Sequence, residues 1–433
     1  MSTLSVVWAR GPAIRPENVL AQGTEFCEAQ RFHLERPIAG ESVTAVGVAT
    51  ALEASGPQRF QRLAKALREQ QERLVVEGPA QQGGALWVGG FGYAERPRVS
   101  RVWQGFPAMR FVLPRLWVLR RGGDCFWGAA AREGMAVARA QLREGLRPCA
   151  SRAGGDAPAP EPRVDARTSA SAYRAGVCAA TAAIRAGDLR KVVLARELEV
   201  RCASGFDAGR LQRRLAVRHP ACAVYRVGRG NRDFVGASPE RLVRVAGGTV
   251  YADALAGTAA RGRTASEDAA LARELVLCKK QQEEHALVVD AIREALEACC
   301  EEVRAPESPG LLATAGIQHL HTPFEARRGR ASALQVAARL HPTPAVAGTP
   351  RPAAQAWLRA HEDFERGWYS GALGWLGASG EGALWVALRG AVLNPGGATL
   401  HAGNGLVADS DPFAEWAETG LKLQSVLNAL LEA

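Results

Sequence analysis

The chain has 433 residues, of which 47% are hydrophobic and 23% are charged, an ordinary composition for a globular protein. Its formal net charge is +10, but the basic residues are mostly arginines spread along the whole chain. No Lys/Arg-rich block is interleaved with aromatic residues, which argues against a nucleic-acid-binding surface, whereas a modest positive excess suits a protein that collects a small dianionic ligand.

The sequence also lacks the usual signs of a membrane or secreted protein. No stretch approaches the roughly 18 consecutive apolar residues that a membrane helix needs. The first ten residues, MSTLSVVWAR, have no basic start and no long apolar stretch of a signal peptide. The nine cysteines form no CxxC pair, and adjacent Cys299 and Cys300 suit packing better than bridging. We therefore expect reduced thiols and a cytoplasmic location.

Residues 1–146 resemble the N-terminal part of an α/β region. Residues 42–49 predict a strand, and residues 58–75 have the apolar spacing of a helix. Gly- and aromatic-rich sequence that follows predicts further strands. Residues 147–167 are rich in Ala, Pro, Gly and charge, which predicts an exposed loop or linker before the second part, residues 168–433.

In the second part, strands come in runs rather than in strict alternation with helices. A helix before residue 187 leads to a strand over 191–200, and the strands 241–245 and 249–253 are joined at Gly247-Gly248, which favours a hairpin. Thr264 opens a helix that we expect to continue as far as Leu296. The fold class predicted is α+β, with mostly antiparallel sheets.

The last helix carries the first candidate site. Asp411 is a good N-cap and Pro412 fits the first helical position. The expected core stripe is Phe413, Trp416, Gly420, Leu423 and Leu427. Glu415, Glu418 and Lys422 share another face, which is either a solvated face with a Glu418–Lys422 salt bridge or a magnesium site. The preceding Gly403-Asn404-Gly405 lets backbone N–H groups approach an anion.

Two further groups of residues are compatible with chemistry. In Glu283-Glu284-His285, adjacent side chains point about 100° apart on a helix, so only one glutamate can easily face a site. Lys191 begins an apolar strand and would be a base only after losing its proton, whereas Glu240 would be an acid only if burial raised its pKa. For both groups a surface role remains the alternative. His319 and His321 alone are poor support for a zinc site.

Together these segments resemble the chorismate-utilising enzymes and, within them, the isochorismate synthases. The resemblance covers about 260 residues, from roughly residue 170 to the C-terminus, in one order. The matching segments are KVVLARE, FVGASPERLV, ALAGTAARG, CKKQQEEHALVV, GIQHL, LHPTPAVAGTP, ERGWYSGALGW, WVALRGA and AGNGLVADSDPFAEWAETGLK. The N-terminal part is similar more loosely, through GGFGY and FVLP.

The resemblance implies a single large chorismate-binding domain, with antiparallel sheets packed together, helices outside and residues 147–167 as an internal loop. It implies that Lys191 activates a water that attacks C2 of chorismate and that Glu240 protonates the departing C4 hydroxyl. It assigns Mg²⁺ to Glu284, Glu415 and Glu418. The implied substrate-binding residues are Gly257, Thr258, His319, Ala345, Tyr369, Arg389, Gly403, Asn404, Gly405 and Lys422.

A few positions distinguish the subfamilies. The ammonia-using relatives lack a lysine at the position of Lys191, and Ala256 stands where some relatives have a nucleophilic lysine. Ala345 within HPTPAV is similar to isochorismate synthases, whereas salicylate synthases, the alternative, usually have Thr. Gln281 and Asn404 depart from the common pattern. The resemblance thus implies an isomerase without a glutamine amidotransferase subunit, in menaquinone or siderophore biosynthesis.

Overall fold

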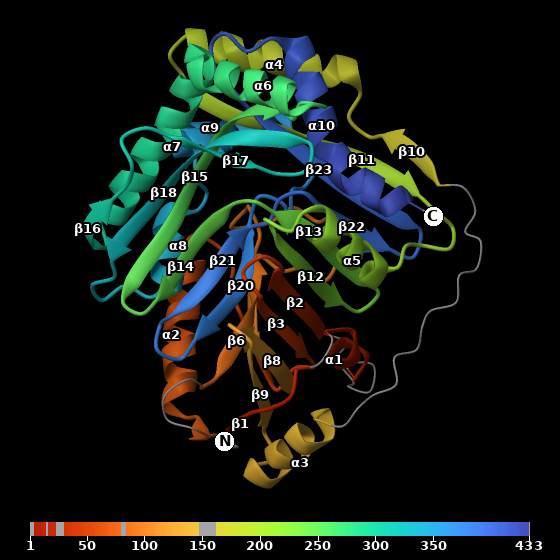
Figure 1. The fold of residues 1–433 in the computed structure, drawn as a ribbon, viewed down its shortest axis with the longest axis vertical. Helices are drawn as coiled ribbons and strands as arrows, with labels where there is room; N and C mark the ends of the chain where they lie inside the picture. Colours follow the sequence, from red (N-terminus) through yellow and green to blue (C-terminus); the bar gives the residue numbers. More distant parts are fainter. Residues whose placement is uncertain (1–3, 14–15, 23–29, 79–83, 147–161, 433) are drawn as a thin grey trace.

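Two large β-sheets form the centre of the molecule and helices cover their outer faces (Figure 1). The computed structural model describes residues 4–13, 16–22, 30–78, 84–146 and 162–432. In spatial order, the first sheet contains β10 (Arg163–Ala166), β11 (Lys191–Arg201), β23 (Gly397–Leu406), β22 (Gly390–Asn394), β13 (Arg232–Ser238), β12 (Ala223–Arg229), β2 (Gln30–Arg36), β3 (Glu41–Val46), β8 (Leu116–Arg121), β9 (Asp124–Ala131), β1 (Ser5–Arg10) and β5 (Val75–Glu77), with β19 (Gly348–Thr349) beside β11.

The second sheet packs against the first. Its strands are β16 (Glu301–Arg304), β18 (Ile317–Arg327), β15 (Thr249–Ala260), β14 (Arg241–Ala246), β21 (Gly382–Val386), β20 (Ala372–Gly377), β6 (Leu86–Phe91), β7 (Met109–Leu113) and β4 (Thr50–Glu53), with β17 (Gly310–Ala313) beside β18. The helices are α1 (Pro16–Gln22), α2 (Arg59–Glu72), α3 (Met135–Gly145), α4 (Ala170–Arg185), α5 (Ala208–Arg218), α6 (Ala265–Leu277), α7 (Lys279–Glu297), α8 (Ala333–Leu340), α9 (Arg351–His361) and α10 (Pro412–Leu431).

The main hydrophobic core lies between the two sheets. It joins residues of the first sheet, such as Phe32 and Phe234, to residues of the second, such as Trp87 and Phe111, all at most 1% exposed. Smaller clusters attach the helices: α5 and α10 to one part of the first sheet, α4 and α9 to another, and α3 to β1 and β9. Burial of apolar area between and outside the sheets therefore holds both layers together.

The predicted α+β class is confirmed, and the sheets are mostly antiparallel, with β1 and β5 as a parallel pair. The predicted hairpin is β14 with β15, and both turn glycines have the positive φ that this turn needs, 57° at Gly247 and 81° at Gly248. The start of α10 is also as predicted, since Asp411 accepts hydrogen bonds from the backbone N–H groups of Phe413 and Ala414.

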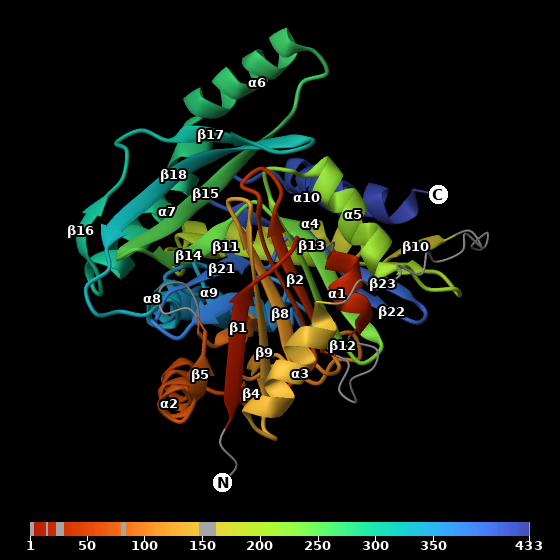
Figure 2. The same cartoon turned by 60° about the horizontal axis from the view of Figure 1, so that its bottom comes forward.

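The helix predicted from Thr264 to Leu296 is wrong in its continuity. It breaks at Cys278, whose extended backbone (ψ 111°) ends α6 and precedes α7. The two halves have different environments, because α7 packs along β15 while only Leu275 of α6 is buried. Figure 2 shows α6 projecting from the body at one end of the molecule. A single straight helix could not serve both environments.

The predicted core stripe of α10 is right in part: Leu423 is buried and Trp416 and Leu427 pack against core clusters, but Phe413 does not. Phe413 is 67% exposed and lies under the guanidinium of Arg174, 4.5 Å from its ring centre. The fully buried face contains Glu415 and Thr419, which were not predicted, followed by Leu423 and Val426. The first half of this face meets polar partners rather than apolar ones, which is why hydrophobic periodicity did not locate it.

Most of the predicted linker, residues 147–161, lies outside the described residues. Its end is a strand, because β10 pairs with β11 from Arg163 to Ala166. Among the described residues, no helix is long and apolar enough to cross a membrane.

Candidate active site

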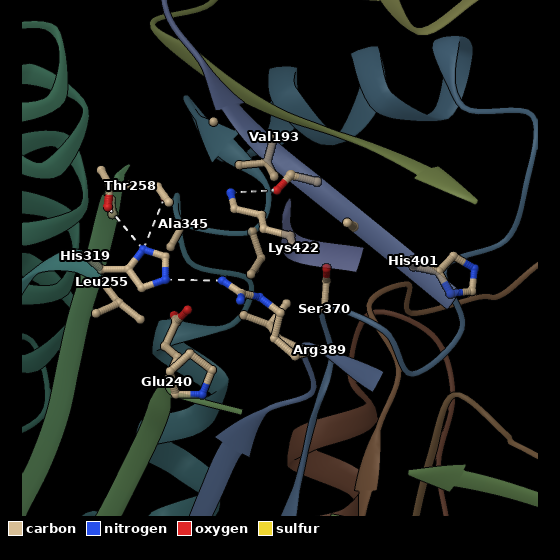
Figure 3. Close-up of a pocket in the computed structure, with 18 of the residues that line it drawn as sticks. Val193, Glu240, Leu255, Thr258, His319, Ala345, Ser370, Arg389, His401 and Lys422 are labelled. Carbon is tan, nitrogen blue, oxygen red and sulfur yellow. Dashed lines mark hydrogen bonds between the residues drawn. The ribbon is translucent and has the colours of Figure 1, made fainter. Parts of the chain in front are cut away.

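A cavity of about 640 Å³, measured with its open mouth, lies where β11 and β23 of the first sheet meet β15 and β18 of the second. Figure 3 shows Glu240, His319 and Arg389 pointing into it from different elements. Eleven of the predicted site residues line the cavity: Glu240, Gly257, Thr258, Glu284, His319, Ala345, Tyr369, Arg389, Gly403, Gly405 and Lys422. Four others, Lys191, Asn404, Glu415 and Glu418, are not among its lining residues. Lys191 contacts the lining Glu284, and Asn404 and Glu418 contact the lining Lys422, whereas Glu415 lies farther out and is hydrogen-bonded to Asn404.

Glu240 is positioned by a short loop between β13 and β14. Its backbone N–H donates to the hydroxyl of Ser238 at 3.2 Å, and its side chain is almost fully buried. Burial raises the pKa of Glu240 to about 8, and the nearby Asp253 carboxylate adds to this rise. Within the described residues, Oε1 of Glu240 has no hydrogen-bond partner. A carboxyl group with this pKa is protonated at neutral pH and can donate a proton into the cavity.

Lys191, the first residue of β11, is fully buried. Its Nζ lies 3.0 Å from Oε1 of Glu284, which comes from α7 and does line the cavity. Lys191 therefore lies behind the cavity wall and contacts one of its residues, Glu284. Glycine at 405 makes this approach possible, because a Cβ atom there would overlap with the Glu284 carboxylate. The strand, the helix and the glycine together create a buried lysine–glutamate pair beside the cavity.

The three acidic residues to which the family resemblance assigns a metal are each paired with a lysine. Glu284 contacts Lys191, Glu415 accepts from Lys280 at 2.8 Å, and Glu418 contacts Lys422 at 2.8 Å. Burial, followed by repulsion from Glu418, raises the pKa of Glu415. The Lys280 ammonium is also within electrostatic range of all three carboxylates, which raise its pKa against the effect of burial.

These carboxylates offer the oxygen donors that Mg²⁺ prefers, although the described residues contain no group of three ligating side chains arranged to hold a metal ion. Mg²⁺ is usually held by one or two carboxylates together with substrate and water oxygens, so no complete protein cage is required. Glu284 and Glu415 supply hard oxygen donors that are buried and held in place by their partners. The Lys280 ammonium lies within electrostatic range of these same carboxylates.

His319 connects three cavity residues. Its Nδ1 lies 3.1 Å from both the carbonyl of Gly257 and the hydroxyl of Thr258, while its Nε2 lies 3.1 Å from Nη2 of Arg389. Because a guanidinium can only donate and a carbonyl can only accept, Nδ1 carries the proton of this histidine. Burial, with the Arg389 charge next, holds the pKa of His319 well below its usual value, so the ring is neutral.

His321, two residues farther along β18, contacts Asp253 at 3.2 Å. The two histidines therefore have separate partners, in agreement with the weak case for a zinc site.

Two of the polar side chains that line the cavity, His401 and Ser370, were absent from the predicted site. His401 stacks on Tyr369 with ring centres 5.2 Å apart, and its Nε2 lies 3.1 Å from the Glu197 carboxylate. Ser370 has a positive φ of 61° and a buried hydroxyl. The strand period of two, applied backwards from Gly405 and Gly403, would have identified His401 as a residue on the same face of β23. No comparable pattern marks Ser370.

The fold and this cavity define a class of protein, and the sequence comparison agrees. The sequence matches the chorismate binding enzyme family over residues 2–431, so the chain belongs to this family. It is 40% identical over 402 residues to the salicylate biosynthesis isochorismate synthase of Pseudomonas aeruginosa, covering 89% of this chain and 82% of that protein. It is 37% identical over 252 residues to the isochorismate synthase MenF of Bacillus subtilis, covering 58% and 54%.

Solved structures show the same fold. The menaquinone-specific isochorismate synthase MenF of Escherichia coli superposes with a TM-score of 0.83 at 24% identity, over 99% of this chain and 95% of that one. The resemblance to chorismate-utilising enzymes, and within them to the isochorismate synthases, is therefore confirmed.

Proposed function

We propose that this protein is an isomerase that converts chorismate reversibly into isochorismate. The observation that carries the proposal is the buried Glu240 carboxyl, whose pKa is about 8, in a cavity that also contains Arg389 and Lys422. The sequence of the chain is 40% identical to that of an isochorismate synthase over most of both proteins, which supports the same reaction. The product would enter menaquinone or siderophore biosynthesis, the routes that the family resemblance implies.

The cations of the cavity suit a small dianionic substrate. Arg389 and the Lys422 ammonium provide positive charge on the cavity wall, and Gly403 and Gly405 expose backbone without side chains. In the proposed complex Arg389 and Tyr369 bind one carboxylate, and Lys422 with the glycine backbone orients the ring. The Arg389 side chain is already held by a hydrogen bond to the neutral His319, so it loses little conformational entropy when the substrate binds.

Glu240 and Lys191 supply acid and base in the proposed reaction. Lys191 Nζ takes a proton from a water molecule as the water oxygen bonds to ring C2, the double bonds shift, and the bond from C4 to its hydroxyl breaks. Glu240 gives its proton to this leaving hydroxyl, which departs as water. Because Nζ of Lys191 lies 3.0 Å from the Glu284 carboxylate, this contact must open in the substrate complex before Lys191 can reach the water.

We propose Mg²⁺ as the cofactor, held by Glu284 and Glu415, with Glu418 nearby. When bound, the ion would neutralise a substrate carboxylate and withdraw electrons from the ring. The chain's own contribution is to keep these carboxylates buried and ordered. Because water is the proposed nucleophile, no glutamine amidotransferase subunit is needed.

One assay tests the reaction. Purified protein is incubated with chorismate and Mg²⁺, with and without ammonium, and the products are separated by chromatography. We expect isochorismate to accumulate to an equilibrium with chorismate, with no change on adding ammonium. We expect EDTA to stop the reaction and excess Mg²⁺ to restore it. Dominant formation of salicylate and pyruvate would support the alternative, a salicylate synthase, and an amino product would contradict the role of Lys191.

A further inference from the structure

Asn404 lies on β23 between two glycines that line the cavity. Successive residues of a strand point to opposite faces, so Gly403 and Gly405 face the cavity while the Asn404 side chain points to α10. The Asn404 side chain is 1% exposed. A buried amide with no contact to the cavity must have its hydrogen-bonding groups satisfied by the protein itself.

The Asn404 amide is fully occupied by two residues of α10. Its Nδ2 donates to Oε2 of Glu415 at 2.8 Å and to the Glu415 backbone carbonyl at 2.9 Å. Its Oδ1 accepts from Nζ of Lys422 at 2.8 Å. Only this orientation of the amide satisfies both partners, because a carboxylate accepts and an ammonium donates. Both N–H groups and the oxygen of the amide are therefore used.

The hydrogen bonds of Asn404 fix how the Glu415 carboxylate and the Lys422 ammonium are oriented. With Oε2 of Glu415 held by Asn404, the other oxygen, Oε1, faces the Lys280 ammonium, which is close to the remaining carboxylates. The Lys422 ammonium is held between Oδ1 of Asn404, the Gly403 carbonyl at 3.1 Å and Glu418, and it lines the cavity (Figure 3). One amide thus links a carboxylate of the proposed metal site to an ammonium of the substrate cavity.

We propose that Asn404 is a positioning residue that fixes Glu415 and Lys422 relative to each other, so that metal ligand and substrate-binding cation keep one geometry. This inference rests on the proposed function. A leucine at 404 has nearly the same size but removes the hydrogen bonds that Asn404 makes to Glu415 and Lys422. An aspartate keeps the bond to Lys422 but places a second carboxylate against Glu415, so the two variants separate the two halves of the role.

The experiment compares Asn404→Leu and Asn404→Asp with the wild type. The matched control is Asn394→Ala at the far end of the same hairpin, where the amide oxygen accepts from the Gly396 backbone N–H. Mg²⁺ binding to the protein alone is measured by calorimetry, and chorismate binding is measured in a Glu240→Gln background, where turnover does not interfere. Steady-state kcat, KM and the thermal midpoint complete the comparison.

We expect Asn404→Leu to weaken Mg²⁺ binding by about tenfold or more, as loss of a partner that orients a metal ligand usually does. We also expect it to weaken chorismate binding, whereas Asn404→Asp weakens Mg²⁺ binding more than chorismate binding. If Asn404→Leu lowered only the thermal midpoint, with both affinities equal to those of Asn394→Ala, Asn404 would be merely structural and the proposal would be overturned.

The wild-type assay keeps the two proposals distinguishable. A wild type that forms no isochorismate would contradict the proposed function, while the variant affinities would still decide the role of Asn404. If the wild type bound no Mg²⁺, the metal half would be overturned, and the chorismate affinities would decide the link to Lys422.

Discussion

Glu362 and Arg366 form an ion pair inside the protein, with Nε of Arg366 2.7 Å from Oε2 of Glu362 and both side chains at most 6% exposed. Arg366 also donates to the backbone carbonyls of Val193 and Val346, and Glu362 accepts from the backbone N–H of Ala195. Val193 and Val346 line the cavity. The pair therefore ties β11, which begins with Lys191, to the segment that contains Ala345.

We predict that Arg366→Met strongly destabilises the protein. The substitution leaves the Glu362 carboxylate buried without its cation and removes two backbone hydrogen bonds. Breaking a buried pair in this way costs about 3–5 kcal/mol. Urea denaturation measures the loss. The control is Arg327→Met, which removes exposed pairs with Glu301 and Glu302 and should cost less than about 1 kcal/mol. Equal losses for both variants would contradict the structural role of the buried pair.

The sequence predicts the fold class and many of its elements because periodicity and turn chemistry are local. The Gly247-Gly248 hairpin and the Asp411 cap depend on neighbours in the chain, and both are confirmed. The burial of Glu415 depends instead on Asn404 and Lys280, which come from other elements. Hydrophobic periodicity treats a glutamate as a surface residue, so it included the exposed Phe413 in the core face of α10 and left out the buried Glu415.

The candidate site shows the same division. The family resemblance named Glu240, Glu284 and Arg389, which the fold brings to one cavity. The resemblance did not indicate that Lys191 lies behind Glu284, or that Asn404 faces α10, because these placements depend on how β11, β23, α7 and α10 pack. The functional roles of these residues stay predictions.

We predict that Lys191→Met abolishes conversion of chorismate and also destabilises the fold. The methionine has no proton to exchange, and it leaves the buried Glu284 carboxylate without its partner at 3.0 Å. Loss of one member of a buried pair costs about 3–5 kcal/mol. The double variant Lys191→Met/Glu284→Gln should regain part of the stability but none of the activity. Activity at the wild-type rate in a folded Lys191→Met protein would exclude Lys191 as the base.

The pKa of Glu240 predicts how activity depends on pH. The acid must be protonated, and its pKa is about 8, so kcat/KM should fall as the pH rises through about 8. Because the Asp253 carboxylate contributes to this raised pKa, Asp253→Asn should shift the alkaline limb to lower pH. Rates between pH 6 and 10 measure both effects. An alkaline limb at the same pH in the wild type and in Asp253→Asn would contradict the assignment.

The same carboxyl group should make stability depend on pH. Its pKa is higher in the folded protein, about 8, than its ordinary value of 4.5. Between these values the folded state binds a proton that the unfolded state lacks, so this contribution to stability is complete below 4.5 and is lost as pH rises to about 8. We predict that Glu240→Gln flattens this decline in urea denaturation at pH 5 to 8. An unchanged pH slope in the variant would show that Glu240 is not its source.

Finally, we predict that Gly405→Ala removes activity while the protein stays folded. The new Cβ atom would overlap with Oε1 of Glu284 and lie 2.7 Å from Cε of Lys191. The Glu284 side chain can rotate away from the new Cβ atom, so the fold survives. This rotation breaks the ion pair of Glu284 with Lys191 and displaces a proposed metal ligand. The control is Gly310→Ala on β17, where the nearest atom is 3.8 Å from the new Cβ. Circular dichroism checks the fold, and the chorismate assay together with Mg²⁺ calorimetry measures the loss. Unchanged Mg²⁺ affinity and turnover in Gly405→Ala would mean that the close approach of Glu284 to β23 has no part in the reaction.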